Sequence, residues 1–154
     1  QAMDLLGRKL ISDKGHSFAL LTKRVEKTLA SAHHIEALKP LADVLEIRWA
    51  KFLPALKQVA TVFENDAELA LANAYLLLDA MGHAVVAWLW LDQAVCAKGL
   101  LAQAELSETR RNLLKGKIVA AQYFISWELP TKDSLLERFE AVDPLCRDVD
   151  TEVL

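Results

Sequence analysis

The amino-acid sequence predicts an all-α protein, an up-and-down antiparallel four-helix bundle with an N-terminal arm and a short C-terminal helix. Three observations support this fold. Apolar residues recur every three or four positions through most of the 154 residues, which is the spacing of one helix face. Only five glycines and four prolines interrupt the chain, so long helical windows remain. No run of alternating β-branched residues and no Asn-Gly or Asp-Gly turn indicates a strand or a hairpin.

Residues 1–14 are expected to form the arm, and residues 15–150 the bundle domain. The arm holds a short amphipathic stretch over 1–12, and Gly15 ends it. The first main helix is predicted over 17–32, where apolar residues occupy one stripe and charged residues the opposite face. The second is predicted from Pro40 to Phe63. A proline inside a helix removes a backbone hydrogen bond, so a kink is expected at Pro54.

The third main helix is predicted from Asp66 to about Gln103, with Asn65 and Glu68 as a capping box and glycines at 82 and 99 as its weak points. Its stretch "AVVAWLWL" (84–91) is apolar on every side. We therefore expect neighbours to wrap it completely, as the central helix or as a layer between the bundle and a second surface. Its length approaches that of a membrane span, but polar residues such as Asp79 interrupt it, so we predict a core helix and no span.

The fourth main helix is predicted from Ser107, as its cap, to Glu128. Pro130 is expected to break it, and Thr131 to cap a last short helix that runs to about Val142. The acidic tail beyond Asp143 and Pro144 is expected to fray.

Composition and charge exclude some classes of function. The chain has 18 basic and 21 acidic residues, well mixed, and a net charge of −3, which argues against a nucleic-acid partner. Its 53% hydrophobic residues predict either a self-association surface or faces that cover another part of a larger protein. Cys96 and Cys146 form no Cys-x-x-Cys pair and no secretory signal is evident, so reduced thiols and a cytoplasmic location are expected.

Asp79 and His83 are the strongest candidate for a polar site. They stand four residues apart, so they lie on the same side of a helix and could form an acid–base dyad. The alternative, which we favour, is a buried imidazole that hydrogen-bonds to a carboxylate or a neighbouring helix, where Gly82 permits a close approach. No glutamate is followed by a histidine three residues later, so a di-iron bundle is not indicated. No metal site is expected, because His33 and His34 lack a chelating spacing.

Two further groups on the long helices call for an interpretation. Trp88 and Trp90 are expected to point to different sides, one toward the core and the other as an interface anchor. Four basic residues of the fourth helix could meet an acidic partner or a nucleotide phosphate, but a solvated face is the favoured interpretation. They are Arg110, Arg111, Lys115 and Lys117.

Three stretches of the chain resemble one enzyme family. "QAMDLLGRK" (1–9) is similar to the segment that follows the catalytic loop of bacterial acyl-CoA dehydrogenases. "ALANAYLLLDAMGHAVVAWLWLDQA" (70–94) and "LLKGKIVAAQYFISWELP" (113–130) resemble the additional C-terminal helical domain of a subgroup that is similar to 3-methylmercaptopropionyl-CoA dehydrogenase. The chain thus resembles an excised C-terminal domain of such an enzyme.

This resemblance implies that the catalytic residues of the parent enzyme lie outside this chain. The parent enzyme would use FAD to desaturate an acyl-CoA thioester at its α,β bond, with a glutamate base in a Tyr-Glu-Gly-Thr stretch upstream of Gln1. Gln1 would be the last residue of a flavin-contacting turn, and the fragment would hold no FAD of its own. Its expected partners are the upstream acyl-CoA dehydrogenase domains and further copies of itself. Asp79, His83, Trp88 and Trp90 would then be structural or interface residues.

Two other functions remain open at this point. The chain could be a free-standing helical module that binds a protein or an apolar ligand, or a small helical enzyme that uses Asp79 and His83.

Overall fold

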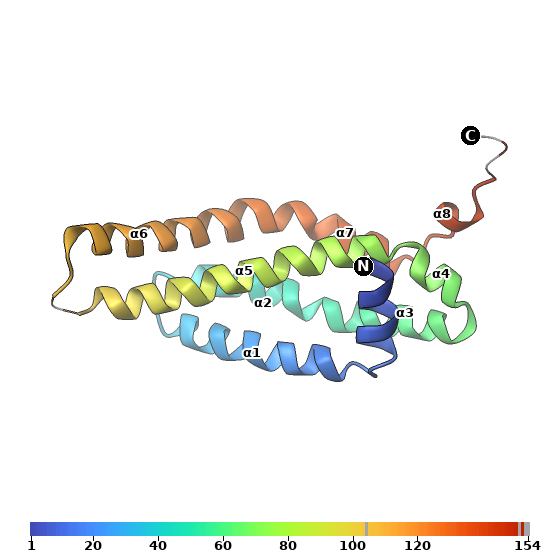
Figure 1. Ribbon diagram of the computed structural model, residues 1–154, viewed down its shortest axis with the longest axis horizontal. Helices are drawn as coiled ribbons and strands as arrows, with labels where there is room; N and C mark the ends of the chain where they lie inside the picture. Colours follow the sequence, from blue (N-terminus) through green and yellow to red (C-terminus); the bar gives the residue numbers. More distant parts are fainter. Residues whose placement is uncertain (104, 151, 153–154) are drawn as a thin grey trace.

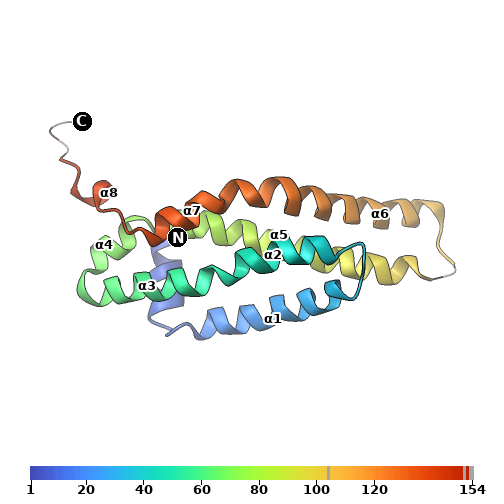
Figure 2. The same ribbon diagram turned by 180° about the vertical axis from the view of Figure 1, so that it is seen from behind.

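The computed structural model describes residues 1–103, 105–150 and 152, and these residues form helices and turns without a β-strand. The long helices lie side by side along one axis (Figures 1 and 2). The chain reverses its direction from α1 to the pair α2 and α3, again to α5, and again to the run from α6 to α7. The elements are η1 (Asp4–Ile11), α1 (His16–His33), α2 (Lys39–Ala50), α3 (Phe52–Asn65), α4 (Ala67–Ala72), α5 (Ala74–Leu101), α6 (Glu108–Tyr123), η2 (Phe124–Glu128), η3 (Leu129–Lys132), α7 (Asp133–Glu140) and α8 (Leu145–Asp148). The predicted all-α class is confirmed.

The N-terminal segment packs across the other helices. η1 is a π-helix that contacts α1, α3 and α5, and its Leu6 is completely buried. Gly15 has a φ of 75°, a left-handed conformation that favours glycine, and it lets the chain turn from η1 into α1. The predicted break at Gly15 is therefore confirmed. Because Leu6 is part of the common core, η1 is held tightly by the remaining helices.

The predicted kink in the second helix is a break between α2 and α3 at Lys51, three residues before Pro54. Pro54 has no N–H to donate to the carbonyl of Ala50, and its ring crowds that carbonyl. The disturbance therefore falls one turn before the proline, and α3 begins with Pro54 in its first turn, where a missing N–H costs little.

The long third helix differs from the prediction at its start. The cap is Asp66, whose carboxylate accepts from the N–H of Leu69 at 2.9 Å, whereas the side chain of Asn65 donates to the carbonyl of Thr61. The helix is divided at Asn73, whose side chain donates to the carbonyl of Asp143 at 2.8 Å. The predicted capping box and the single helix from 66 were therefore wrong.

Neither glycine within α5 weakens that helix visibly. Gly82 and Gly99 both lie inside the continuous span Ala74–Leu101. A Cβ atom built on either one would meet nothing within 4 Å, so the close approach of a neighbouring helix expected at Gly82 is not present.

α6, η2, η3 and α7 follow one another without interruption, and we call this segment the last rod. It follows the prediction as far as Glu128. The hydroxyl of Ser107 accepts from the N–H of Arg110 at 3.3 Å, which confirms this cap. Pro130 does not break the rod, because the chain passes through a 3₁₀ turn, η3, straight into α7. Thr131 does not cap α7, since its hydroxyl donates to the carbonyl of Glu128 at 2.6 Å.

The tail also folds further than expected. It forms the short helix α8, which the guanidinium of Arg147 ties to the carboxylate of Asp66. Part of the predicted fraying concerns residues 151 and 153–154, which lie outside the described residues.

α5 is the central helix, in contact with α1, α2, α6 and α7. Its neighbours do not wrap it completely, however, because Tyr75, Val86 and Leu89 are 66%, 39% and 44% exposed. A helix that neighbours cover on only part of its circumference keeps one side turned outward, and in α5 this side is apolar as well. Complete wrapping was therefore wrong, although α5 does take the central place that was one of the two expected alternatives. The second surface of the other alternative stays a prediction. The largest completely buried side chains are those of Leu6, Val25, Leu38, Leu45, Val59, Leu77, Leu91, Ile125 and Phe139.

Candidate functional site

The predicted pair Asp79 and His83 comes together in the structure and gains a third member. His83 Nδ1 lies 2.9 Å from Asp79 Oδ1 and also 2.9 Å from the backbone carbonyl of Asp79. Lys132, which ends the turn η3 just before α7, donates from Nζ to Asp79 Oδ2 at 3.1 Å. The carboxylate therefore joins a basic group of its own helix to one from the last rod.

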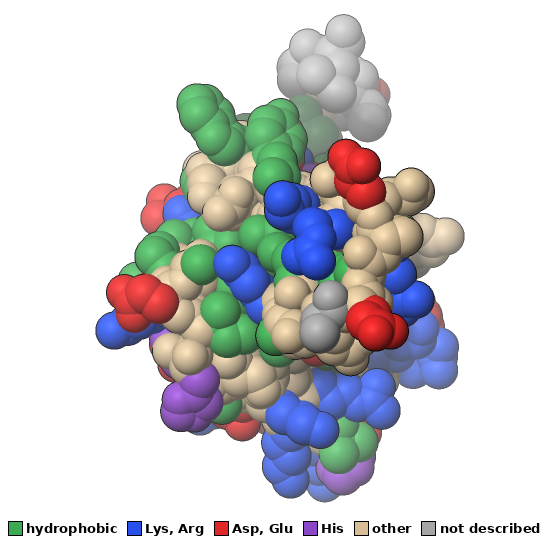
Figure 3. Space-filling view, turned by 90° about the vertical axis from the view of Figure 1, so that its left-hand side faces the viewer, with side chains coloured by type: hydrophobic (Ala, Val, Ile, Leu, Met, Phe, Trp, Pro, Cys, Tyr) green, Lys and Arg blue, Asp and Glu red, His purple; other side chains and the backbone are tan. Residues whose placement is uncertain are grey.

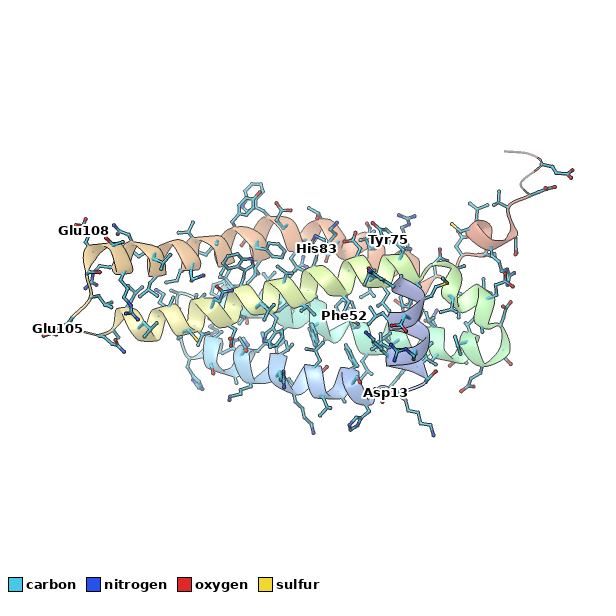
Figure 4. All side chains as sticks on the ribbon, viewed as in Figure 1. Asp13, Phe52, Tyr75, His83, Glu105 and Glu108 are labelled. Carbon is cyan, nitrogen blue, oxygen red and sulfur yellow. The ribbon has the colours of Figure 1, made fainter. Side chains whose placement is uncertain are left out.

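The imidazole itself is held by packing. Its ring stacks on the ring of Phe124 from η2, with centroids 6.1 Å apart and planes 17° apart. Figure 4 shows His83 on the side of α5 that faces this last rod. His83 and Asp79 face an open groove that is otherwise lined by apolar side chains and Gly82.

This geometry limits the chemistry available at His83. A general base needs further polar groups that position a substrate against it. Among the described residues that line the groove, the polar side chains are those of Asp79 and His83, and both are already engaged with each other. The arrangement therefore favours helix packing over catalysis.

Lys132 was not anticipated from the sequence. It lies 53 residues from Asp79, and no spacing rule relates positions on different helices. An acidic residue in a strongly apolar helix needs a partner, so the presence of some cation could have been expected, but its identity could not.

Trp88 and Trp90 lie on different sides of α5. The indole N–H of Trp88 donates to the hydroxyl of Thr28 in α1 at 2.9 Å, and this hydroxyl donates to the carboxylate of Asp92 at 3.0 Å. Trp90 lies beside α6, where Lys117 Nζ is 5.7 Å from its ring centroid. Both indoles are half-buried. Trp88 thus serves a polar contact between helices, which the sequence did not indicate.

The four basic residues of α6 do not act as one cluster. Lys117 turns toward α5, where it donates to the side-chain carbonyl of Gln93 at 2.7 Å. Arg110 and Lys115 stay exposed near the end of the molecule where α5 leads into α6. Cys96 and Cys146 are free and exposed.

His33 is the last residue of α1 and lies between two carboxylates of α2. Its Nε2 is 3.2 Å from Glu46, and its Nδ1 is 3.6 Å from Asp43. These three residues could offer ligand atoms within 4.8 Å of one another, which the missing chelating spacing around His33 and His34 did not suggest. Because both carboxylates are exposed, polar pairing between the two helix ends explains the arrangement.

α5 is long and apolar enough to cross a membrane by length and composition alone. Its inward side is covered by α1, α2, α6 and α7, which is how a core helix is packed. We therefore interpret it as part of a protein core.

A family model matches most of the chain. The family described as "Acetyl-CoA dehydrogenase C-terminal like" matches residues 21–150, which include α2 to α8 and most of α1. No curated protein matches the chain. The match covers far more than half of the sequence and agrees with the all-helical structure, so the chain belongs to the acetyl-CoA dehydrogenase C-terminal-like family.

Proposed function

We propose that this chain is the C-terminal accessory domain of an FAD-dependent acyl-CoA dehydrogenase, with a role in packing and subunit assembly and no catalysis of its own. The parent would desaturate acyl-CoA thioesters at the α,β bond and would belong to the subgroup similar to 3-methylmercaptopropionyl-CoA dehydrogenase. In this proposal the helices form an up-and-down four-helix bundle over residues 15–150, and residues 1–14 form the arm from the catalytic domain.

The observation that carries the proposal is the apolar surface of α5 and of the continuous segment formed by α6 and η2. Tyr75 in α5 is 66% exposed, and Leu113, Tyr123 and Trp127 in the last rod are 61%, 56% and 71% exposed. Exposed apolar side chains that recur along a helix are typical of a surface that meets another protein or domain. For a family named for the C-terminal part of a dehydrogenase, the partners we propose for this surface are the upstream domains of the same enzyme and a second subunit.

The flavin would belong to those upstream domains. Gln1 is the only position of this chain for which we propose a contact with FAD, through the turn that would precede η1. Gln1 is exposed, and its carbonyl accepts from the N–H of Leu5 at 2.9 Å, so this end of the chain is held near the packed η1. A cytoplasmic location follows for a domain of such an enzyme.

Deletion in the parent enzyme tests the proposal. The complete reading frame and a version that ends before residue 15 are compared for acyl-CoA-dependent reduction of an electron acceptor, for FAD content and for molecular mass. We expect the truncated enzyme to lose stability or subunit association, and the 154-residue chain alone to bind no FAD. A reading frame that lacks dehydrogenase domains upstream of Gln1 would instead favour the free-standing binding module.

A further inference from the structure

α6 carries a second apolar stripe on the side that points away from the core. Its members follow one another at intervals of three and four residues, the spacing of a seam between two paired helices. We call it the outer stripe, and it consists of Leu113, Gly116, Ala120, Tyr123 and Trp127. The residues that α6 and η2 bury in the core belong to a different face and include Leu114, Ile118, Ala121 and Ile125.

The middle of the outer stripe is formed by small residues. Gly116 is exposed in the interior of α6, and a Cβ atom built on it would meet nothing within 4 Å. Glycine is a poor helix former, so its presence in mid-helix calls for a reason that the chain's own packing does not provide. With Ala120 one turn later, it leaves a shallow place between the large side chains of Leu113 and Tyr123, where another helix backbone can approach closely.

Charged groups lie at the two ends of this stripe and have opposite signs. Arg110 is exposed near the start of α6, and Glu128 ends η2. The hydroxyl of Tyr123, itself a member of the stripe, donates to Glu128 Oε1 at 2.8 Å and thereby keeps this carboxylate beside the seam. Figure 3 shows hydrophobic side chains projecting from the upper side of the molecule, where α6 runs, beside a group of Lys and Arg side chains.

We infer that the outer stripe binds the outer stripe of a second copy of this chain, with the two α6 helices antiparallel and crossing at Gly116 and Ala120. The inference rests on the proposed function, because it assigns a partner to part of the assembly surface. In such a pair the two-fold axis passes beside residue 118. Measured along the helix, Arg110 of each copy then lies about 12 Å from the crossing point, and Glu128 about 15 Å from it in the opposite direction. Each arginine therefore lies close to the partner's Glu128.

The self-complementary charge pattern is the reason for choosing a second copy over another partner. An antiparallel pair forms the contact between Arg110 and Glu128 twice, once at each end of the seam. A parallel pair would instead bring Arg110 against Arg110 and Glu128 against Glu128.

Sedimentation equilibrium of the 154-residue chain tests the close crossing. We expect a monomer–dimer equilibrium, and Gly116→Leu should raise the dissociation constant at least tenfold. Leucine is the better helix former, so the unfolding midpoint of the dilute, monomeric variant should stay equal or rise. Gly99→Leu is the control, because Gly99 is likewise an exposed helical glycine with open space above it, in the last turn of α5, and it should leave the dissociation constant unchanged.

A charge exchange tests the antiparallel register. Arg110→Glu and Glu128→Arg should each weaken the dimer, and the double variant should restore it. Within one chain the two positions lie about 27 Å apart, too far for a direct contact, so restoration can only come from pairing between copies.

Each outcome decides the inference. A chain that stays monomeric, or a dimer that Gly116→Leu and the single charge variants leave intact, would overturn it. A monomeric chain whose removal still disables the parent dehydrogenase would overturn this inference alone. A dimer that responds as expected, in a chain without any upstream dehydrogenase domain, would support the inference and overturn the proposed function.

Discussion

Replacing His83 with alanine distinguishes a packing residue from a catalytic one. The side chain is 31% exposed, so most of the ring is buried. The variant loses one hydrogen-bonded contact with Asp79, which contributes about 0.5–1.5 kcal/mol. It also loses the stack on Phe124, whose 6.1 Å centroid separation is near the long end of the range for aromatic pairs that contribute about 0.5–1.5 kcal/mol.

The loss of unfolding free energy in this variant is limited because the carboxylate of Asp79 keeps a second partner. After the substitution it still accepts from Lys132 at 3.1 Å, so no buried charge is left without a partner. We therefore expect His83→Ala to reduce the free energy of unfolding by about 1–2 kcal/mol, from the two contributions together. For a domain of this size the melting temperature should fall by roughly 2–8 °C.

Urea unfolding followed by circular dichroism measures this loss, with His34→Ala as the control. His34 is exposed, and changing it should alter the unfolding free energy by less than about 0.5 kcal/mol. Asp79→Ala should cost more than His83→Ala, because it deprives both His83 and Lys132 of their acceptor. If His83→Ala unfolds like the native chain while the parent dehydrogenase loses its activity, the packing interpretation is refuted.

Three further predictions concern the helix contacts. Thr28→Val keeps the shape of the side chain but leaves the indole N–H of Trp88 without its acceptor, so we expect a loss of about 1–3 kcal/mol in urea unfolding; no loss would show that water replaces the hydroxyl. Leu77→Ala removes a completely buried side chain of α5 and should cost about 2–5 kcal/mol, measured in the same way, and a smaller loss would indicate a loosely packed core. The N–H of Leu69 and the guanidinium of Arg147 hold the pKa of Asp66 below its ordinary value of 3.8. The stability from Asp66 is thus complete above that value and is lost as the pH falls through the lower folded pKa, so the protection of amides in α4 and α8 against hydrogen exchange, taken relative to the intrinsic rate at each pH, should fall there; protection that does not change in this range would contradict the assignment.

Polar contacts within one helix could be predicted from the sequence, whereas polar contacts between helices could not. The pairing of Asp79 with His83 was predictable, because four residues on one helix always bring two side chains to the same side. Lys132, Thr28 and the carboxylates beside His33 were not, since each reaches its partner from another helix. The cap at Asp66 was missed for a local reason, because Asn65 and Asp66 are equally good caps and only the hydrogen bond of Asn65 to Thr61 decides between them.

The sequence by itself determined the helical class, the break at Gly15 and the cap at Ser107, because these depend on local conformation and on apolar periodicity. Only the tertiary structure decided which sides of α5 and α6 are covered. The burial of a side chain depends on which helices pack together. A helix that is apolar on two faces therefore has the same sequence pattern whether its second face meets its own core or another protein. The exposure of Tyr75 and Trp127 made that distinction here.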